Sequence, residues 1–179
     1  MEQIPDDALM KQVIDRDEIA FTELVDRYLN PLFSFVHRLC GNPQDAEDIT
    51  QDTFVRVWER AKTWRAGQVQ FKTWLYQIAR NLCIDRFRKT GKYIEESLES
   101  NFVAAPERSS FEDEQKMQHL YKSIEELPER QRTAIVLCNL QGWSQSDVAQ
   151  ILGCSVNAVD ALVGRGRQSL RIKLSKFRD

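Results

Sequence analysis

The segment WSQSDVAQILGCSVNAVDALVGRGRQSLR, residues 143–171, decides the class of fold. A small residue, Ala149, is followed four positions later by Gly153, which supplies a turn where a positive φ is expected. Six positions further on comes the β-branched Val159, and Ser155 stands where it can cap a second helix. These residue types at these spacings predict a helix-turn-helix. An ordinary helical hairpin with a turn glycine is the alternative.

The second helix of this pair is the candidate DNA-reading element, because a helix-turn-helix inserts that helix into the major groove. Its N-terminal residues face base edges, whereas cations further along suit phosphates. Gly164 and Gly166 are expected to weaken the helix, and either to let its backbone approach DNA or to end it early. The base-edge candidates are Ser155, Asn157, Asp160 and Ala161, and the phosphate candidates are Arg165, Arg167, Arg171 and Lys173.

The rest of the chain predicts an all-α protein, because strand patterns are almost absent and apolar residues recur every three or four positions. Pro31 is expected to kink or interrupt the longest helix and Gly41 to end it. Asn42 is a good N-cap for the next helix, with Pro43 at its first position. The expected helices span about 5–15, 18–40, 42–61 and 71–89.

Residues 91–111 lose this periodicity and contain Gly91, Pro106 and clustered Ser and Glu. Such a composition is typical of an inter-domain linker. The sequence therefore predicts two small helical domains, 1–90 and 112–179, joined by a flexible acidic linker.

Charge along the chain comes in blocks that the net charge of -2 conceals. Residues 56–92 carry ten Lys or Arg and two Asp or Glu, and residues 130–179 carry eight and three. Residues 1–52 carry four bases and twelve acids, and residues 93–129 carry three and ten. Two basic surfaces separated by acidic ones can bind phosphate locally in a chain that is slightly acidic overall. The acidic blocks either meet a basic protein partner or shield the basic faces from indiscriminate DNA binding.

The stretch FKTWLYQIARNLCIDRFRK, residues 71–89, interleaves cations with aromatics, as single-stranded nucleic acid requires. Helical spacing divides it into two stripes, with the aromatics mostly on the inward one. The loop before it, 65–70, is marked by Gly67 and polar residues. We expect the inward stripe to contain Trp74, Leu75, Ile78, Ala79 and Leu82, and the polar stripe Thr73, Gln77, Arg80, Asn81, Ile84, Asp85 and Arg88.

Several classes of protein are disfavoured. No phosphate-binding glycine loop, metal cluster or nucleophile motif points to an enzyme, and no cofactor is expected. The N-terminus lacks the features of a signal peptide and no apolar run would span a bilayer, so a cytoplasmic location is expected. The cysteines lack metal-site spacing with each other or with the two histidines and are expected to be reduced and mostly buried; they are Cys40, Cys83, Cys138 and Cys154.

Three segments together resemble a bacterial RNA polymerase sigma factor of the sigma-70 family, extracytoplasmic-function (ECF) group. Residues 45–59, DAEDITQDTFVRVWE, resemble the family's core-polymerase-binding segment. Residues 71–89 resemble the segment that reads and melts the minus-10 element, and residues 127–171 resemble the domain for the minus-35 element. Where the family often continues from Val159 with a charged residue, serine and arginine, this chain has Asp160, Ala161 and Leu162.

The resemblance implies a function and partners. It implies a non-catalytic factor that joins the beta and beta-prime subunits of core RNA polymerase and directs initiation at promoter DNA. An anti-sigma protein, often membrane-bound, would hold it silent. The residues implied to contact polymerase are Asp45, Asp48, Gln51 and Asp52. Those implied to contact the minus-10 element are Lys62, Trp64, Gln77, Arg80, Asn81, Asp85, Arg88 and Lys89, with the loop 62–70 and Asn81 capturing flipped bases. A stand-alone helix-turn-helix regulator, binding duplex DNA by itself, is the alternative.

Overall fold

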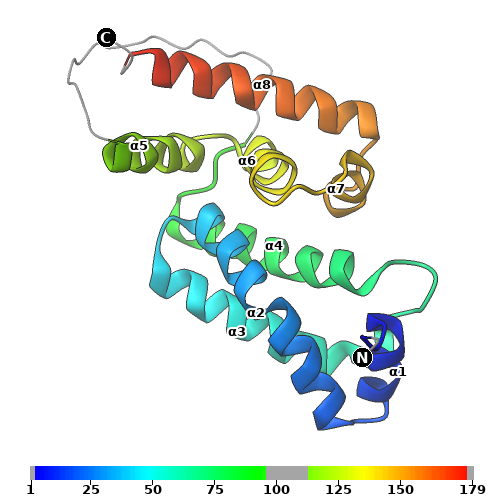
Figure 1. Ribbon diagram of the computed structural model, residues 1–179. Helices are drawn as coiled ribbons and strands as arrows, with labels where there is room; N and C mark the ends of the chain where they lie inside the picture. The colour runs from blue at the N-terminus through cyan, green and yellow to red at the C-terminus, as the bar shows by residue number, and fades with distance from the viewer. Residues whose placement is uncertain (1–2, 96–112, 177–179) are drawn as a thin grey trace. The chain divides into compact units, whose positions relative to one another are not determined.

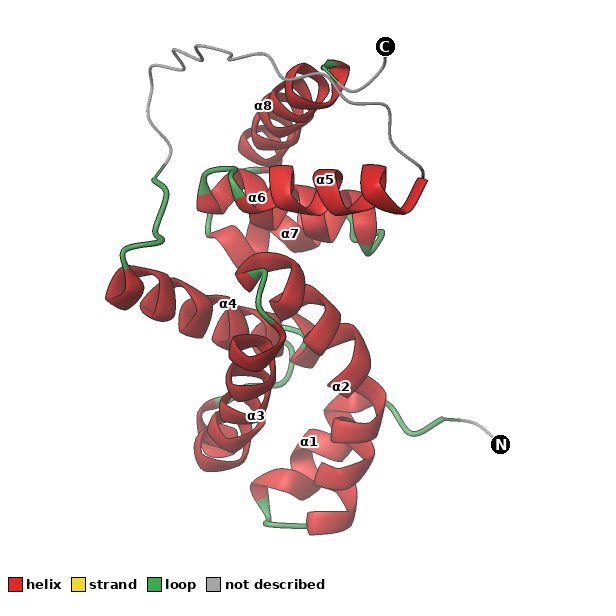
Figure 2. Ribbon diagram, turned by 90° about the vertical axis from the view of Figure 1, so that its left-hand side faces the viewer, coloured by secondary structure: helices red, strands yellow, loops and turns green. Residues whose placement is uncertain are grey.

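A computed structural model describes residues 3–95 and 113–176 of the chain. Every regular element in those two ranges is helical, which confirms the all-α prediction (Figures 1 and 2). Most of the expected linker lies outside the described residues. The chain divides into two compact units, Met1–Arg86 and Phe87–Asp179.

The first unit contains α1, α2, α3 and most of α4; α2 is the longest of these helices and packs against both α1 and α3 (Figure 2). The expected caps are present. Gly41 ends α2 with a φ of 69°, and the Asn42 side chain accepts hydrogen bonds from the first backbone N–H groups of α3. The helices are α1 (Asp6–Ile14), α2 (Glu18–Cys40), α3 (Pro43–Arg60) and α4 (Phe71–Thr90), with a short 3₁₀ turn, η1 (Ala61–Thr63), after α3.

Pro31 does not interrupt α2, so an interruption there is wrong. A proline inside a helix removes one backbone hydrogen bond and crowds the preceding turn. Pro31 itself is exposed, but the next turn buries Leu32 and Phe35 completely. Packing of these side chains holds the helix together across the proline.

The core of the first unit takes side chains from both sides of α4. Phe71 and Leu75 are buried, and so is Tyr76, whose ring centroid lies 4.9 Å from that of Phe35 on α2. Thr73, expected on the polar stripe, is 1% exposed, which corrects that expectation. Trp74, expected inward, is only half-buried. Because α4 is covered on more than one side, its outward polar face is narrower than helical spacing suggests.

The second unit holds the helix-turn-helix pair α7 and α8, and α8 packs against α5, α6 and α7. Gly153 ends α7 with a φ of 62°, and Ser155 Oγ accepts a hydrogen bond of 3.1 Å from the Ala158 N–H to start α8. The elements are α5 (Asp113–Glu125), α6 (Glu129–Ile135), a π-helical turn η2 (Val136–Leu140), α7 (Gln145–Leu152) and α8 (Val156–Ser175).

Gly166 neither ends α8 nor lies open to solvent, contrary to expectation. It is buried, and a Cβ added there would lie 2.7 Å from Ile135 Cγ1 of α6. The absent side chain thus allows α8 and α6 to pack closely. At Gly164 an added Cβ would meet nothing within 4 Å.

Candidate functional site

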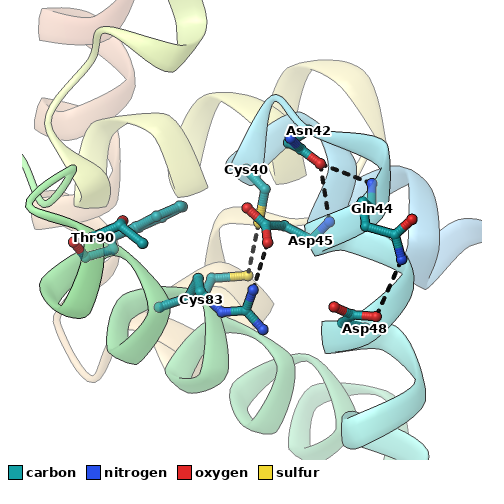
Figure 3. A network of polar contacts seen from close by, with 9 residues as sticks. Cys40, Asn42, Gln44, Asp45, Asp48, Cys83 and Thr90 are labelled. Carbon is teal, nitrogen blue, oxygen red and sulfur yellow. Dashed lines mark hydrogen bonds and ion pairs between the residues drawn. The ribbon is translucent and has the colours of Figure 1, made fainter.

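The first candidate surface is the N-terminal half of α3, where three carboxylates and an amide were singled out. Gln51 and Asp52 are exposed, whereas Asp45 and Asp48 are half-buried. Asp45 accepts a 2.5 Å ion-paired hydrogen bond from Arg86 Nη1 on α4. Asp48 Oδ1 accepts a 3.4 Å hydrogen bond from the side-chain Nε2 of Gln44 (Figure 3). The two exposed residues are therefore the most accessible part of this surface.

Sequence patterning missed two residues of this region. Arg86 is the partner of Asp45, although 41 positions separate them in the chain. Val55, one turn after Asp52, is 53% exposed, so the polar surface of α3 ends on an accessible apolar side chain. Phe54 and Val57 lie on the apolar stripe of α3 and are buried, whereas Val55 falls outside that stripe, so helical spacing is the signal that could have found it.

The loop between α3 and α4 is shaped by Trp64, which was expected at the DNA surface. The side chain is 2% exposed, and its Nε1–H donates a 3.1 Å hydrogen bond to the Val69 carbonyl. The ring is therefore enclosed in this structure and not accessible for stacking on a base. Lys62 is exposed, and Arg65 donates to the Lys62 carbonyl at 2.6 Å.

The polar stripe of α4 forms the second candidate surface. Gln77, Asn81 and Asp85 follow at intervals of four and so share one face. Asn81 and Asp85 are exposed, and Gln77 is half-buried. Arg80 is half-buried, and Arg88 and Lys89 are exposed; the Arg88 guanidinium lies 4.9 Å above the ring of Tyr93. The stripe thus presents an amide, a carboxylate and cations, a set that can donate to and accept from base edges and bind phosphate.

The third candidate surface is the N-terminal half of α8. Ser155, Asn157, Asp160 and Ala161 are all exposed. The Ser155 oxygen accepts the capping hydrogen bond, and its O–H remains a donor. Asp160 accepts a 3.2 Å hydrogen bond from the Gln145 amide of α7, an interaction that sequence patterning missed. Gln145 thereby orients the one carboxylate on this surface.

The arginines of α8 do not all point freely outward. Arg165, although exposed, donates to the Ala161 carbonyl of its own helix at 3.3 Å. With the Asn139 amide oriented to satisfy its hydrogen bonds, its oxygen accepts from Arg167 Nη2 at 2.8 Å and Nε at 3.2 Å. Arg171 is exposed. Phosphate binding by Arg165 or Arg167 would thus compete with contacts inside the unit.

Two further observations concern metal sites and membrane-spanning helices. Within residues 3–95 and 113–176, no group of three or more His, Cys, Asp or Glu side chains is arranged to hold a metal ion. No helix in the same part of the chain has the length and apolar character needed to cross a membrane.

Comparison with known proteins identifies the class to which these three surfaces belong. Residues 24–93 match the sequence family described as Sigma-70 region 2, and residues 117–170 match Sigma-70, region 4. The first unit thus carries the region 2 helices α2 to α4, and the second unit carries the region 4 helix-turn-helix.

Curated relatives place the chain within that class. The ECF RNA polymerase sigma factor SigW of Bacillus subtilis is 34% identical over 92% of this chain and 94% of its own length. SigE of Mycolicibacterium smegmatis is 32% identical over 88% of this chain, which spans only 62% of that relative. The sigma factor RpoE of Bartonella quintana, solved in complex with the anti-sigma factor NepR, has a TM-score of 0.67 and 28% identity over 87% of this chain and 96% of its own.

The chain therefore belongs to the ECF group of the sigma-70 family of RNA polymerase sigma factors. Such factors direct promoter-specific initiation of transcription. A stand-alone operator-binding regulator, the alternative considered from the sequence, is not favoured.

Proposed function

We propose that the chain joins the beta and beta-prime subunits of core RNA polymerase through the exposed polar surface of α3, and that it recognises a promoter with α4 and α8. Family membership, together with the two sigma-70 regions in their order along the chain, carries this proposal. The factor acts by binding and positioning, without a catalytic step of its own, at the cytoplasmic site of transcription.

The charge of the α3 surface suits a basic surface on a protein partner. Gln51 and Asp52 are accessible, and Asp48 lies beside them, so a cationic partner meets negative charge with an amide next to it. Asp45 would contribute only if its ion pair with Arg86 were shared or exchanged, which makes Asp48 and Asp52 the principal contacts.

The α4 stripe fits a melted strand. Moving a base out of the duplex costs a few kcal/mol in lost stacking and pairing, and hydrogen bonds to its Watson–Crick edge must offset this cost. Asn81 offers both a donor and an acceptor on an exposed face, and the cations of α4 lie near enough in sequence to follow the phosphates. Because Trp64 is enclosed, hydrogen bonding by Asn81 and Gln77 carries more of the recognition than stacking on that ring.

The α8 surface fits duplex DNA of the minus-35 element. Ser155 and Asn157 stand at the helix start, where side chains reach base edges in the major groove. Asp160 cannot approach a phosphate favourably, but it can accept a hydrogen bond from the exocyclic amino group of cytosine. The Gln145 side chain holds Asp160 Oδ1 with a 3.2 Å hydrogen bond.

We further propose control by an anti-sigma protein. Support comes from RpoE of Bartonella quintana, which was solved with an anti-sigma factor and aligns with 87% of this chain. A partner that covers the α3 surface or the polar face of α4 would block polymerase or promoter binding directly.

Reconstitution with core polymerase tests the proposal. Run-off transcription from a cognate promoter should require both the chain and core enzyme, and the free chain should bind the duplex only weakly. Strong duplex binding by the free chain, with no transcript from any promoter in a genomic library, would instead identify an operator-binding regulator.

The α3 surface has its own test. Asp48→Arg should abolish association with core polymerase in a pull-down while leaving the circular dichroism spectrum unchanged. Asp26→Arg makes the same charge change at an exposed site on α2 and should retain association. Equal retention by both variants would assign polymerase binding to another surface.

A further inference from the structure

Two cysteines that lie far apart in the sequence meet in the first unit. Cys40 is the last residue of α2, Cys83 lies in α4, and their sulfur atoms are 3.9 Å apart (Figure 3). Neither cysteine is part of a disulfide in this structure. A disulfide requires an S–S distance of about 2 Å, so the sulfurs need to approach by roughly 2 Å. Rotation of the two side chains and a small backbone adjustment can supply such a movement.

The position of Cys40 permits that adjustment. It ends α2, and Gly41 follows with a φ of 69° before the exposed Asn42. The required shift therefore falls at a helix end next to a turn, where fewer hydrogen bonds resist it than in the middle of a helix. Cys83, in contrast, is completely buried within α4, so its side chain can rotate but its backbone stays in place.

The two thiols also differ in access. Cys40 is only half-buried and can meet a small oxidant, whereas Cys83 has no exposed surface. This pairing of an accessible thiol with a shielded thiol beside it is the arrangement in which one sulfur is oxidised and the other resolves it.

We propose that Cys40 and Cys83 form an oxidation-sensitive dithiol that closes to an intramolecular disulfide joining α2 to α4. With hydrogen peroxide as the oxidant, the Cys40 thiolate attacks one peroxide oxygen, the O–O bond breaks, and hydroxide leaves to give a sulfenic acid. The Cys83 sulfur then displaces the sulfenic hydroxyl, which departs as water. In sum, two thiols lose two electrons and two protons, and one peroxide becomes two waters.

The disulfide would add a second connection beside an existing one. Arg86 lies three residues after Cys83 and Asp45 five residues after Cys40, and their ion pair already joins the start of α3 to α4. A covalent bond there restricts the unfolded chain and stabilises the first unit. The inference goes beyond the proposed function and does not depend on it, because its test uses the chain without polymerase or DNA.

The full chain, reduced and then treated with a small molar excess of hydrogen peroxide, provides the test. Its mass should fall by about 2 Da, the loss of two hydrogens. Non-reducing proteolysis should yield one cross-linked peptide pair that contains Cys40 and Cys83. The midpoint of thermal unfolding of the first unit should rise by about 10 °C, as expected for a cross-link of this span. Dithiothreitol should reverse all three changes.

Matched variants complete the test. Cys40→Ser and Cys83→Ala should each abolish the cross-link, and folding of both is checked by circular dichroism. The double variant Cys138→Ser/Cys154→Ser should keep it. Burial raises the pKa of the Cys138 thiol, partly offset by the nearby Arg167, which makes that cysteine a slow competitor. Oxidation that stops at a sulfinic acid on Cys40, or that cross-links Cys138 or Cys154 instead, would overturn the proposal.

Discussion

The two helices proposed to read DNA, α4 and α8, are equally long but embedded differently. Each has 20 residues and several cations. Nine residues of α4 are buried, against five of α8. Only a narrow stripe of α4 is therefore accessible to a partner, whereas most of the circumference of α8 is accessible. In α4 the residues buried within the first unit run from Phe71 to Cys83. In α8 only the line from Val159 to Leu170 is covered.

This difference matches the two forms of DNA that the helices are proposed to bind. A duplex offers base edges only inside a groove about 12 Å wide, so a helix that reads it has to project from its domain. A base that has left the duplex comes to the protein, and a narrow polar stripe on a fixed support is then sufficient. We therefore expect α4 to be held rigidly by the first unit and α8 to project from the second unit.

The position of α8 nevertheless depends on close packing at Gly166. Replacing this glycine should have the largest effect on stability of the substitutions considered below. Gly166→Leu places a side chain where even a Cβ lies 2.7 Å from Ile135 Cγ1, so the second unit should lose about 3 kcal/mol of its free energy of unfolding. Gly164→Leu, in open space two residues earlier, should stabilise the unit by up to about 1 kcal/mol. Urea denaturation followed by circular dichroism measures both changes. Equal stability of the two variants would show that α6 can move away from α8 without loss of stability.

The stripe on α4 can be tested by removing its central amide. Asn81→Ala should slow open-complex formation by roughly thirtyfold, which corresponds to about 2 kcal/mol of lost contacts to a flipped base. Initial promoter binding should change by less than about twofold, because the duplex is still closed at that stage. Permanganate footprinting and a mobility-shift assay separate the two steps. Similar losses in both steps would mean that Asn81 contacts duplex DNA.

The start of α8 provides the counterpart. Asn157→Ala should weaken holoenzyme binding to the minus-35 duplex by about 1 kcal/mol, roughly fivefold, because one base-edge contact disappears. Melting at the minus-10 element should then proceed at the normal rate once the complex has formed. A selection of binding sequences should show relaxed preference at one or two positions. Unchanged preference would move base reading to Asp160 and its partner Gln145.

Local chemistry made part of this architecture predictable. Gly41 and Gly153 end their helices in the left-handed region, and the Asn42 and Ser155 side chains cap the helices that follow. Each of these features depends on residues within a few positions of one another, so the sequence contains the whole interaction. The small residue Ala149 and the turn at Gly153 predicted the helix-turn-helix for the same reason.

Burial was less predictable, because it depends on distant parts of the chain. Thr73 and Trp64 are polar or amphipathic and lie where exposure was expected, yet both are enclosed. Pro31 was expected to kink or interrupt α2, but burial of Leu32 and Phe35 in the next turn keeps the helix continuous. The role of Gly166 likewise requires the position of Ile135, which lies 31 residues earlier in the chain.

The smallest expected effect concerns one ion pair on each helix. Arg86 of α4 pairs with Asp45, and Lys173 of α8 pairs with Glu126. The side chains of Arg86 and Asp45 are 33% and 28% exposed, so water screens the pair and its coupling energy should be about 0.5 kcal/mol. Glu126 is more exposed, at 55%, and the coupling on α8 should be weaker still.

Double-mutant cycles with Arg86→Met and Asp45→Asn, and with Lys173→Met and Glu126→Gln, measure these couplings by urea denaturation. The cycle matters because Arg86 and Lys173 make other interactions, which a single substitution would also remove. A coupling above about 2 kcal/mol for the α4 pair would show that Asp45 is committed to holding α3 against α4. Asp45 would then be unable to leave its partner for polymerase, and binding through α3 would rest on Asp48, Gln51 and Asp52.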